Sequence, residues 1–213
     1  MTRVLRINKL LIAFLLLIVA MLLDSVLPFS LWRQWRLADT ALSASSKSDA
    51  DGDRGVSIGF IGCGTIASAI VTGMATQKEV NIDSMVVTRR SEAKSKLLQE
   101  SFPDLVTIQD DNQNIVDNCQ LIFLTVLPQQ TKQVLESLTF KPGQSLVSLV
   151  STASLPDLVQ DSSLDASQVS KMICLPSVAR HQGVCLHCFC DKEHATTPSN
   201  ALLTELFTAM GGV

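Results

Sequence analysis

The segment Val56–Ala67 constrains the fold of this chain more than any other part of the sequence. It begins with apolar residues and glycine, which is typical of a strand buried on both faces of a parallel sheet. It continues into a turn of the pattern Gly62-x-Gly64-x-x-Ala67, and residues 68–74 then have the composition of a helix. A glycine turn between such a strand and a helix predicts a dinucleotide-binding turn, whereas the glycine spacing alone would be weak evidence.

Each small residue of this turn has a physical role in such a site. Gly62 permits the tight turn, Gly64 lets the backbone approach a pyrophosphate, and Ala67 lets the helix pack against the strand. The free N–H groups and the positive dipole end of the helix would hold the phosphates. The competing interpretation is a tight turn in an α/β domain without this ligand. The residues predicted to bind the cofactor here are Gly62, Cys63, Gly64, Thr65, Ile66 and Ala67.

From Val56 onward, strand and helix patterns alternate along the chain. Further strands are expected at 84–88, 105–108, 121–126, 145–150, 169–175 and 184–190, with helices between them and a last helix at 200–210. Strands that alternate with helices predict the α/β class, with a doubly wound, mostly parallel sheet and helices on both faces. We therefore assign residues 56–213 to one domain.

The N-terminal part has a different composition. Basic residues precede the apolar run 10–23, as in a secretory signal peptide or a signal anchor. The run is shorter than the roughly 20 residues of a membrane-spanning helix. We expect residues 1–32 to form a hydrophobic helix that targets the protein to a membrane or a secretory compartment, either cleaved or retained. The small, polar residues that follow predict a flexible linker over 33–55.

The net charge of −3 gives no strong basic field. A nucleic-acid partner therefore has no electrostatic support, and a small-molecule substrate is expected instead.

The turn after the second strand bears on the choice of nucleotide. NAD-binding domains usually end this strand with an acidic residue, which holds the ribose 2′-OH. Here the strand ends in Thr88-Arg89-Arg90-Ser91. Guanidinium and hydroxyl groups suit a 2′-phosphate through charge-assisted hydrogen bonds. The pattern favours NADP(H) over NAD, with Arg89, Arg90 and Ser91 as the contacts; the alternative is that the arginines are solvated charges at the start of a helix.

The order of these motifs resembles the N-terminal domain of pyrroline-5-carboxylate reductase over about Val56 to Gly183. The glycine turn resembles the nucleotide loop of that family, and Thr88–Ser91 resembles its NADP-phosphate turn. Asn112, after Asp111, resembles the asparagine that approaches the adenosine ribose. The segment 121–129 resembles a strand that ends in Val-Lys-Pro-Gln. This last likeness implies cofactor contacts from Val126, Leu127 and Pro128.

The resemblance implies a Rossmann fold and transfer of a hydride from NADPH to the imine of 1-pyrroline-5-carboxylate, which gives proline. Leu127 departs from the family lysine, and Ser177 from the family asparagine. In the family, a helical C-terminal domain follows, forms the dimer and supplies much of the imino-acid pocket. We expect the present sequence to lack that domain, so no catalytic residue is assigned, and an oligomer is expected only if such a domain is supplied.

Two other functions stay open at this point. The chain could be a membrane-tethered NADPH-binding module without catalytic activity of its own. The β-hydroxyacid dehydrogenases and the deazaflavin-linked NADP reductases also share the glycine turn, although the former would need a catalytic lysine in a C-terminal helix.

Cysteines and histidines are concentrated between residues 181 and 194. Thiolates and imidazoles are zinc ligands, and Cys185-x-x-Cys188 has a common ligand spacing. In a strand, however, these two cysteines point to opposite faces. We therefore favour buried thiols over a metal site and predict no metal. Redox sensing is the weaker third interpretation, because no nearby cation clearly lowers a thiol pKa. The cluster comprises His181, Cys185, His187, Cys188, Cys190 and His194.

Overall fold

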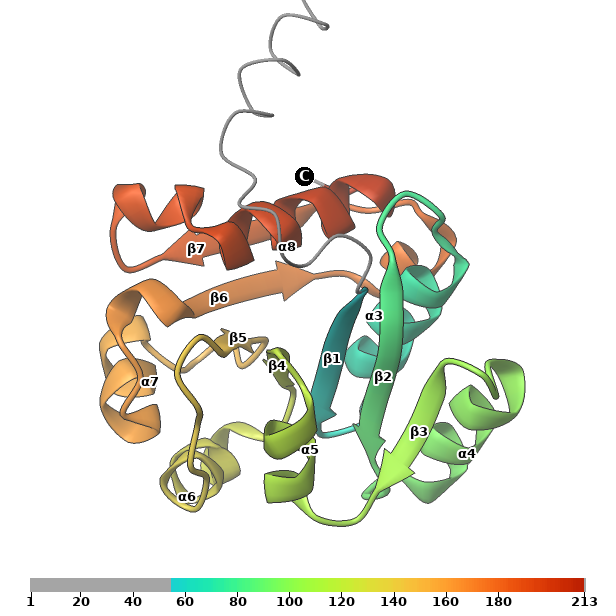
Figure 1. Cartoon of the computed structure of the whole chain (residues 1–213), viewed down its shortest axis with the longest axis horizontal. Coiled ribbons are helices and arrows are strands. Elements are labelled where there is room, and N and C mark those ends of the chain that lie inside the picture. The colour runs from blue at the N-terminus through green and yellow to red at the C-terminus, as the bar shows by residue number, and fades with distance from the viewer. Residues whose placement is uncertain (1–54, 213) are drawn as a thin grey trace, which may run out of the picture. The chain divides into compact units, whose positions relative to one another are not determined.

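The computed structural model describes residues 55–212, which contain a seven-stranded sheet (Figure 1). The strand order is β3-β2-β1-β4-β5-β6-β7. Strands β1 to β6 run parallel, and β7 pairs antiparallel with β6 at one edge. The strands are β1 (Val56–Ile61), β2 (Ile82–Thr88), β3 (Val106–Gln109), β4 (Leu121–Leu124), β5 (Ser145–Ser148), β6 (Val169–Cys174) and β7 (Cys185–Phe189).

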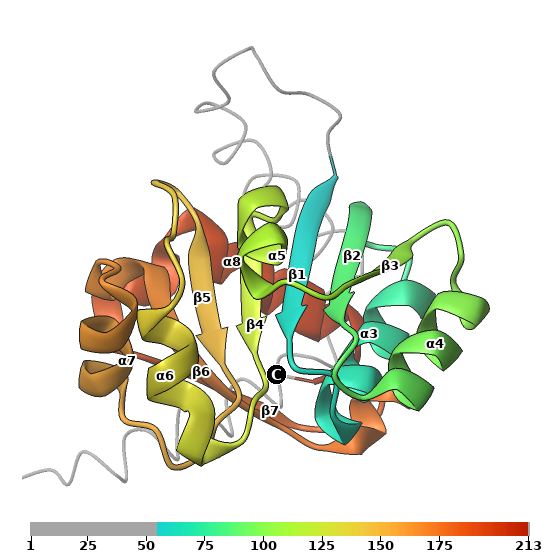
Figure 2. The ribbon, with the colours of Figure 1, turned by 90° about the horizontal axis from the view of Figure 1, so that it is seen from below.

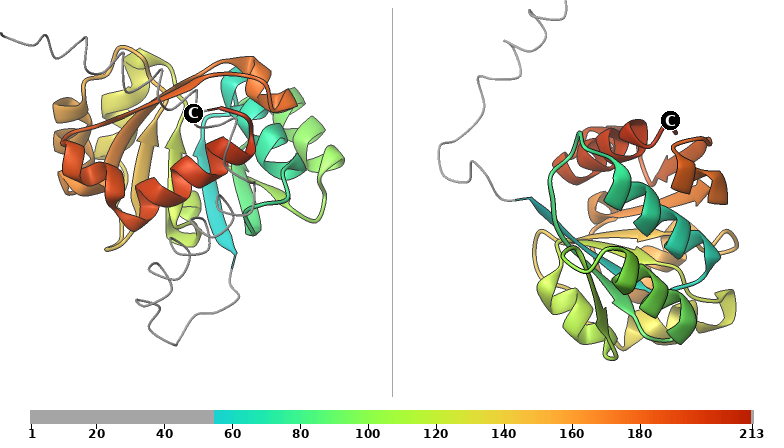
Figure 3. Two further views of the ribbon diagram at one scale, coloured as in Figure 1. Left: turned by 90° about the horizontal axis from the view of Figure 1, so that it is seen from above. Right: turned by 90° about the vertical axis from the view of Figure 1, so that its right-hand side faces the viewer.

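Helices cover both faces of this sheet (Figure 2). One face packs against α3 (Thr65–Thr76), α4 (Glu92–Ser101) and α8 (Pro198–Ala209). The other packs against α5 (Asn112–Asn118), α6 (Thr131–Glu136) and α7 (Leu155–Ser162). Figure 3 shows α8 lying across the first face. Short 3₁₀ helices complete the described part: η2 (Pro128–Gln130), η3 (Ala166–Gln168), η4 (Pro176–Arg180) and η5 (Lys192–Thr196).

The core on the first face is built around an aromatic row. Phe60 of β1 and Phe123 of β4 are register partners, and their rings stack with centroids 4.9 Å apart. The ring of Phe207, from α8, packs on Phe123 at 6.3 Å. All three side chains are almost completely buried, so a helix distant in sequence is fixed against the two central strands.

Helices α5 and α8 begin where the local sequence supplies a side-chain cap. Asp111 accepts a hydrogen bond from the backbone N–H of Gln113, and Thr197 accepts one from Asn200. A proline follows Thr197 at the first turn of α8, where a missing N–H leaves no intrahelical bond unmade. These local signals fix the start of α5 and α8.

The predicted fold class is confirmed for the described residues: the sheet is mostly parallel and covered by helices on both faces. The strand predicted over 121–126 ends earlier, at Leu124, because Thr125 turns toward the glycine-rich segment.

The hydrophobic helix and signal predicted for 1–32, and nearly all of the linker at 33–55, lie outside the described residues. Within residues 55–212, none of the helices has the length and apolar character to span a membrane.

Candidate functional site

The candidate site lies where the carboxyl ends of β1, β2 and β4 meet. β1 pairs with β2 on one side and with β4 on the other, so the chain changes direction across the sheet at this point. Ligands of open α/β sheets bind in the crevice that such a reversal creates. An open pocket of about 420 Å³ lies here. Its lining residues are Ile61, Gly62, Thr88, Arg89, Arg90, Glu92, Asp110, Asn112 and Val126.

Gly62 adopts a conformation that only glycine tolerates well. Its φ is +103°, and a Cβ added there would lie 2.6 Å from the carbonyl oxygen of Thr125. The Gly62 N–H donates to Thr88 Oγ1 at 2.8 Å, and Thr125 Oγ1 donates to the Gly62 carbonyl at 2.7 Å. Two threonines at the ends of β2 and β4 therefore hold the turn. Thr125 was not predicted from the sequence, since its role depends on β4 lying beside β1.

Gly64 differs from Gly62 because its surroundings in the described part of the chain do not require a glycine. Its φ is −83°, and among residues 55–212 no atom beyond its chain neighbours lies within 4 Å of an added Cβ. The space beside it is open, as close approach of a phosphate to the backbone would demand. Gly64 is also the N-cap of α3, which carries no side-chain cap and no acidic residue in its first turn. The free N–H groups of this turn remain available to an anion.

Within the glycine turn, the side chains of Cys63 and Ala67 are buried in the core. Burial raises the pKa of the Cys63 thiol, so the thiol stays protonated at neutral pH. These residues can contribute to a site only through their backbone. Thr65 is exposed and Ile66 is partly buried.

Lys94 of α4 reaches the start of α3. Its Nζ donates to Thr65 Oγ1 at 2.8 Å, which places an ammonium beside the free N–H groups of the helix. This cation was missed from the sequence. It becomes visible only once α3 and α4 are known to pack side by side on one face of the sheet (Figure 1).

The two arginines after β2 have different surroundings. Arg89 forms an ion pair with Asp110, which follows β3. No ion pair to Arg90 is found in the described part of the chain. Glu92 also lines the pocket, but it pairs with Lys96 at 2.8 Å, and the hydrogen bond from Lys96 lowers the pKa of Glu92. Of these two arginines, Arg90 is therefore the one whose charge is not balanced by an acidic partner among the described residues.

Ser91, between Arg90 and α4, is the N-cap residue of that helix. Its side chain makes no capping hydrogen bond. The hydroxyl and the start of α4 therefore lie directly beside the arginine turn, although Ser91 is not among the residues that line the pocket.

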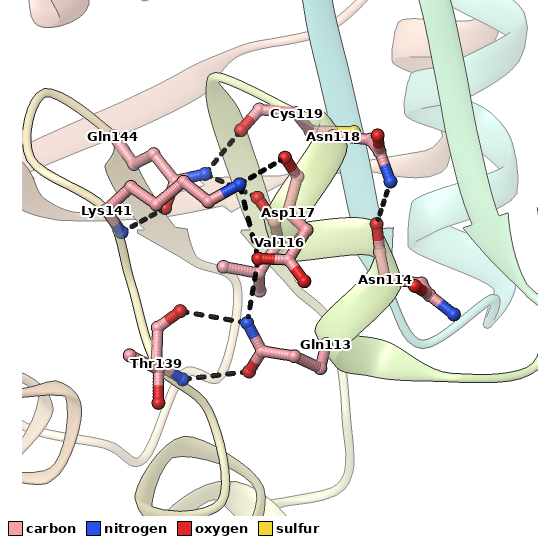
Figure 4. Close-up of polar contacts among 9 residues, drawn as sticks. All are labelled: Gln113, Asn114, Val116, Asp117, Asn118, Cys119, Thr139, Lys141 and Gln144. Atoms are coloured by element: carbon pink, nitrogen blue, oxygen red, sulfur yellow. Dashed lines mark hydrogen bonds and ion pairs between the residues drawn. The ribbon is translucent and has the colours of Figure 1, made fainter.

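Asn112 lines the pocket and is the first residue of α5. Two glutamines, Gln113 of α5 and Gln144 before β5, connect this helix to the segment 139–144 (Figure 4). The Gln113 amide accepts from the N–H of Thr139 and donates to its carbonyl, both at 2.9 Å. The buried Gln144 amide donates to the carbonyls of Val116 and Cys119 and accepts from the N–H of Lys141. These hydrogen bonds hold α5, which begins at Asn112, against the segment 139–144.

The structure brings five of the predicted contacts to one pocket, namely Gly62, Arg89, Arg90, Asn112 and Val126. Leu127 and Pro128 are outside its lining, and the Leu127 side chain is 63% exposed. Both follow Val126 directly, so they lie at the end of the crevice on the β4 side.

Cys185 and Cys188 lie on opposite faces of β7, as predicted for a strand. Cys185 is buried and Cys188 is exposed. Within residues 55–212 no group of three or more potential metal ligands is found.

His187, on β7, should make the stability of the folded protein depend on pH. Within the described residues neither of its ring nitrogens has a hydrogen-bond partner, and burial lowers the pKa of His187 to about 4 from 6.5. The unfolded chain therefore takes up this proton at higher pH than the folded protein. The free energy of unfolding should fall as the pH drops from about 6.5 to about 4. Because the ring is partly exposed, we expect a loss of about 1 to 2 kcal/mol, less than the full shift would imply.

Urea denaturation of the wild type and of His187→Leu at about pH 7 and about pH 4.5 tests this expectation. The variant should show the smaller loss of stability on acidification. An equal loss in both proteins would assign the acid sensitivity to other groups.

Residues 57–153 match the family model described as NADP oxidoreductase coenzyme F420-dependent. A stretch of 108 residues is 27% identical to pyrroline-5-carboxylate reductase 1 of Dictyostelium discoideum, covering 50% of this chain and 19% of that protein.

Similar solved structures include pyrroline-5-carboxylate reductases from three organisms. The Streptococcus pyogenes enzyme has a TM-score of 0.59 at 21% identity, over 74% of this chain and 56% of that one. The Coxiella burnetii enzyme has a TM-score of 0.58 at 22% identity, over 75% and 59%. The Plasmodium falciparum enzyme, solved with NADP bound, has a TM-score of 0.58 at 15% identity, over 74% and 57%.

These findings confirm the resemblance to the N-terminal domain of pyrroline-5-carboxylate reductases, and the chain is similar to NAD(P)-dependent oxidoreductases of that type. The chain spans a little over half the length of these solved reductases and a fifth of the curated relative.

Proposed function

We propose that residues 56–213, which resemble the cofactor domain of pyrroline-5-carboxylate reductases, bind NADP(H) and take part in reducing a C=N bond of a small cyclic imino acid. The observation that carries this proposal is the pocket at the ends of β1 and β2, which is lined by Gly62 of the glycine turn and by Arg90, an arginine without an acidic partner among the described residues. The NADP(H) prediction agrees with the matched family model and with the Plasmodium falciparum reductase, whose structure holds NADP.

The residues present fit a phosphorylated dinucleotide. The open space beside Gly64 and the uncapped start of α3 suit the pyrophosphate, and the ammonium of Lys94 adds positive charge there. Arg90, with the Ser91 hydroxyl beside it, suits the 2′-phosphate. Asn112 lines the same pocket, and its amide would donate or accept a hydrogen bond at the ribose.

When bound, the cofactor supplies the hydride, and the task of this chain is to hold and orient the dinucleotide. The N–H groups of α3 would hold the pyrophosphate end, and the Thr88 and Thr125 hydroxyls bond to the Gly62 backbone and so keep the glycine turn in shape. No residue of the described chain is assigned to proton delivery or to binding the substrate carboxylate. The reductase function is favoured over a binding module without activity because the relatives are oxidoreductases.

Fluorescence titration of the full chain with NADPH and with NADH tests the cofactor part of the proposal. NADPH should bind more tightly than NADH, and failure to bind either would overturn the proposal. NADPH oxidation on addition of 1-pyrroline-5-carboxylate tests the reductase part. Binding without turnover would leave the cofactor assignment standing and reject the activity for this chain alone.

A further inference from the structure

Two buried thiols lie against each other at the end of the β6–β7 ladder. The Cys174 thiol donates a hydrogen bond to the Cys185 sulfur, with the two Sγ atoms 2.9 Å apart. Both residues are buried, at 7% and 5% exposure. They are also direct register partners in the antiparallel pair, so the contact follows from strand pairing and not from a chance approach of two flexible side chains.

The pairing of the two strands suits a cross-link at this position. Directly opposite residues of antiparallel strands have Cα atoms about 4.5 to 5.5 Å apart. Disulfides span Cα separations of about 4.4 to 6.8 Å. A bond between Cys174 and Cys185 therefore fits the usual spacing of paired antiparallel strands, and the two sulfur atoms already lie close together.

The segment between the two cysteines is held in place by other contacts. It contains η4, which packs closely on α3: a Cβ added to Gly73 would lie 2.7 Å from the carbonyl oxygen of Val178. Nε2 of His181 lies 3.1 Å from the Gly73 carbonyl oxygen and 3.0 Å from Thr76 Oγ1. These contacts hold segment 175–184 against α3 whether or not Cys174 and Cys185 are linked.

We propose that Cys174 and Cys185 are an oxidisable dithiol that forms a reversible disulfide closing segment 175–184. The oxidant is a peroxide, which is small enough to reach a largely buried sulfur. The proposal does not depend on the cofactor.

The oxidation proceeds in two balanced steps. The Cys185 thiolate attacks one oxygen of hydrogen peroxide, the O–O bond breaks, and hydroxide leaves to become water with the proton released by the thiol, giving a sulfenic acid. The Cys174 sulfur then attacks the Cys185 sulfur, so that the S–S bond forms and the S–O bond breaks. The leaving hydroxide takes the Cys174 proton. Two thiols and one peroxide thus yield one disulfide and two waters.

The environment supports Cys185 as the first sulfur to react. The hydrogen bond from Cys174 lowers the pKa of Cys185, whereas the same bond raises the pKa of Cys174. The sequence offered no nearby cation that would activate a thiol. The Cys174 thiol lowers the pKa of Cys185 instead. Because Cys174 lies outside the cysteine-rich segment 181–194, the sequence did not indicate this partner.

Two exposed cysteines provide the control: Cys188, on β7, and Cys190, just after it. Cys188 and Cys190 are exposed, so they are the cysteines that an oxidant meets first. A variant carrying Cys188→Ser and Cys190→Ser leaves both buried thiols untouched. In this variant Cys185 is the only cysteine between Arg180 and Lys192, which makes the assignment of a cross-link unambiguous.

The experiment treats the full-length double variant with hydrogen peroxide, blocks the remaining thiols by alkylation and digests the protein with trypsin without reductant. The expected product joins peptide 172–180 to peptide 181–192 with the loss of two hydrogen atoms, and dithiothreitol should separate them. Peptides alkylated at both positions, or cross-links between two chains, would overturn the proposal.

Thermal melting supplies a second readout on the wild type, which needs no substitution in the core. Closing a loop of this length should raise the melting temperature of the oxidised protein by roughly 5 to 10 °C, and reduction should reverse the rise. Cys185→Ser should show neither the cross-link nor the rise. Wild-type protein that carries the linked peptides but melts at a lower temperature would contradict the inference that the spacing of the paired strands fits a disulfide.

Discussion

The Gly64→Ala variant should bind NADPH about 10- to 100-fold more weakly than the wild type while melting at the same temperature. Among residues 55–212, the added methyl group meets no atom within 4 Å beyond its chain neighbours. The φ of −83° at residue 64 is available to alanine, so we expect the fold to tolerate the change. The methyl group does occupy the open space in which the pyrophosphate would approach the backbone. Isothermal titration calorimetry with NADPH and a melting curve measure the two quantities.

Gly62→Ala is the matched comparison, because it adds the same methyl group two residues earlier. Here the methyl group would lie 2.6 Å from the Thr125 carbonyl oxygen, at a φ of +103°. We expect this variant to lose about 2 kcal/mol or more of unfolding free energy. If Gly64→Ala left the NADPH affinity unchanged, the open space would not be a phosphate site.

Replacing Arg90 by alanine should weaken NADPH binding by about 10- to 100-fold and leave NADH binding within about twofold. Only NADPH carries the 2′-phosphate, and a charge-assisted hydrogen bond to it is lost. The ratio of the two dissociation constants is the measurement, because a general disturbance of the site would weaken both cofactors together.

Two controls sharpen the result for Arg90. Arg89→Ala should reduce the preference for NADPH less, since the Arg89 guanidinium is already paired with Asp110. Lys192→Ala removes the same charge from an exposed position in η5, outside the pocket, and should change neither constant. An Arg90 variant that retains the full preference for NADPH would refute the proposed role of this residue.

The parts of the site that follow from local sequence could be predicted. The φ of Gly62 and the helix that follows Gly64 are properties of a short, continuous segment, and the structure shows both. The alternation of apolar strands with helices likewise indicates the fold class, because each strand carries its own pattern of buried residues.

The remaining parts depend on residues that meet only through packing. Arg89 pairs with Asp110 across two strands, and Lys94 reaches Thr65 from a neighbouring helix. Nothing in the local sequence around either cation predicts its partner. The thiol pair is similar: Cys174 and Cys185 are separated by a 3₁₀ helix, and only the antiparallel register makes them neighbours.

Helix α3 connects the two regions on which our proposals rest. Its first turn carries the free N–H groups of the candidate phosphate site, and Gly73 and Thr76 near its other end contact the segment between the two thiols. A single rigid helix of 12 residues therefore has one end at each region. By thermodynamic linkage, any factor by which the disulfide changes NADPH affinity is also the factor by which NADPH changes the equilibrium between thiols and disulfide. The redox midpoint of the thiol pair, measured with and without saturating NADPH, thus reports how strongly the two ends of α3 are coupled.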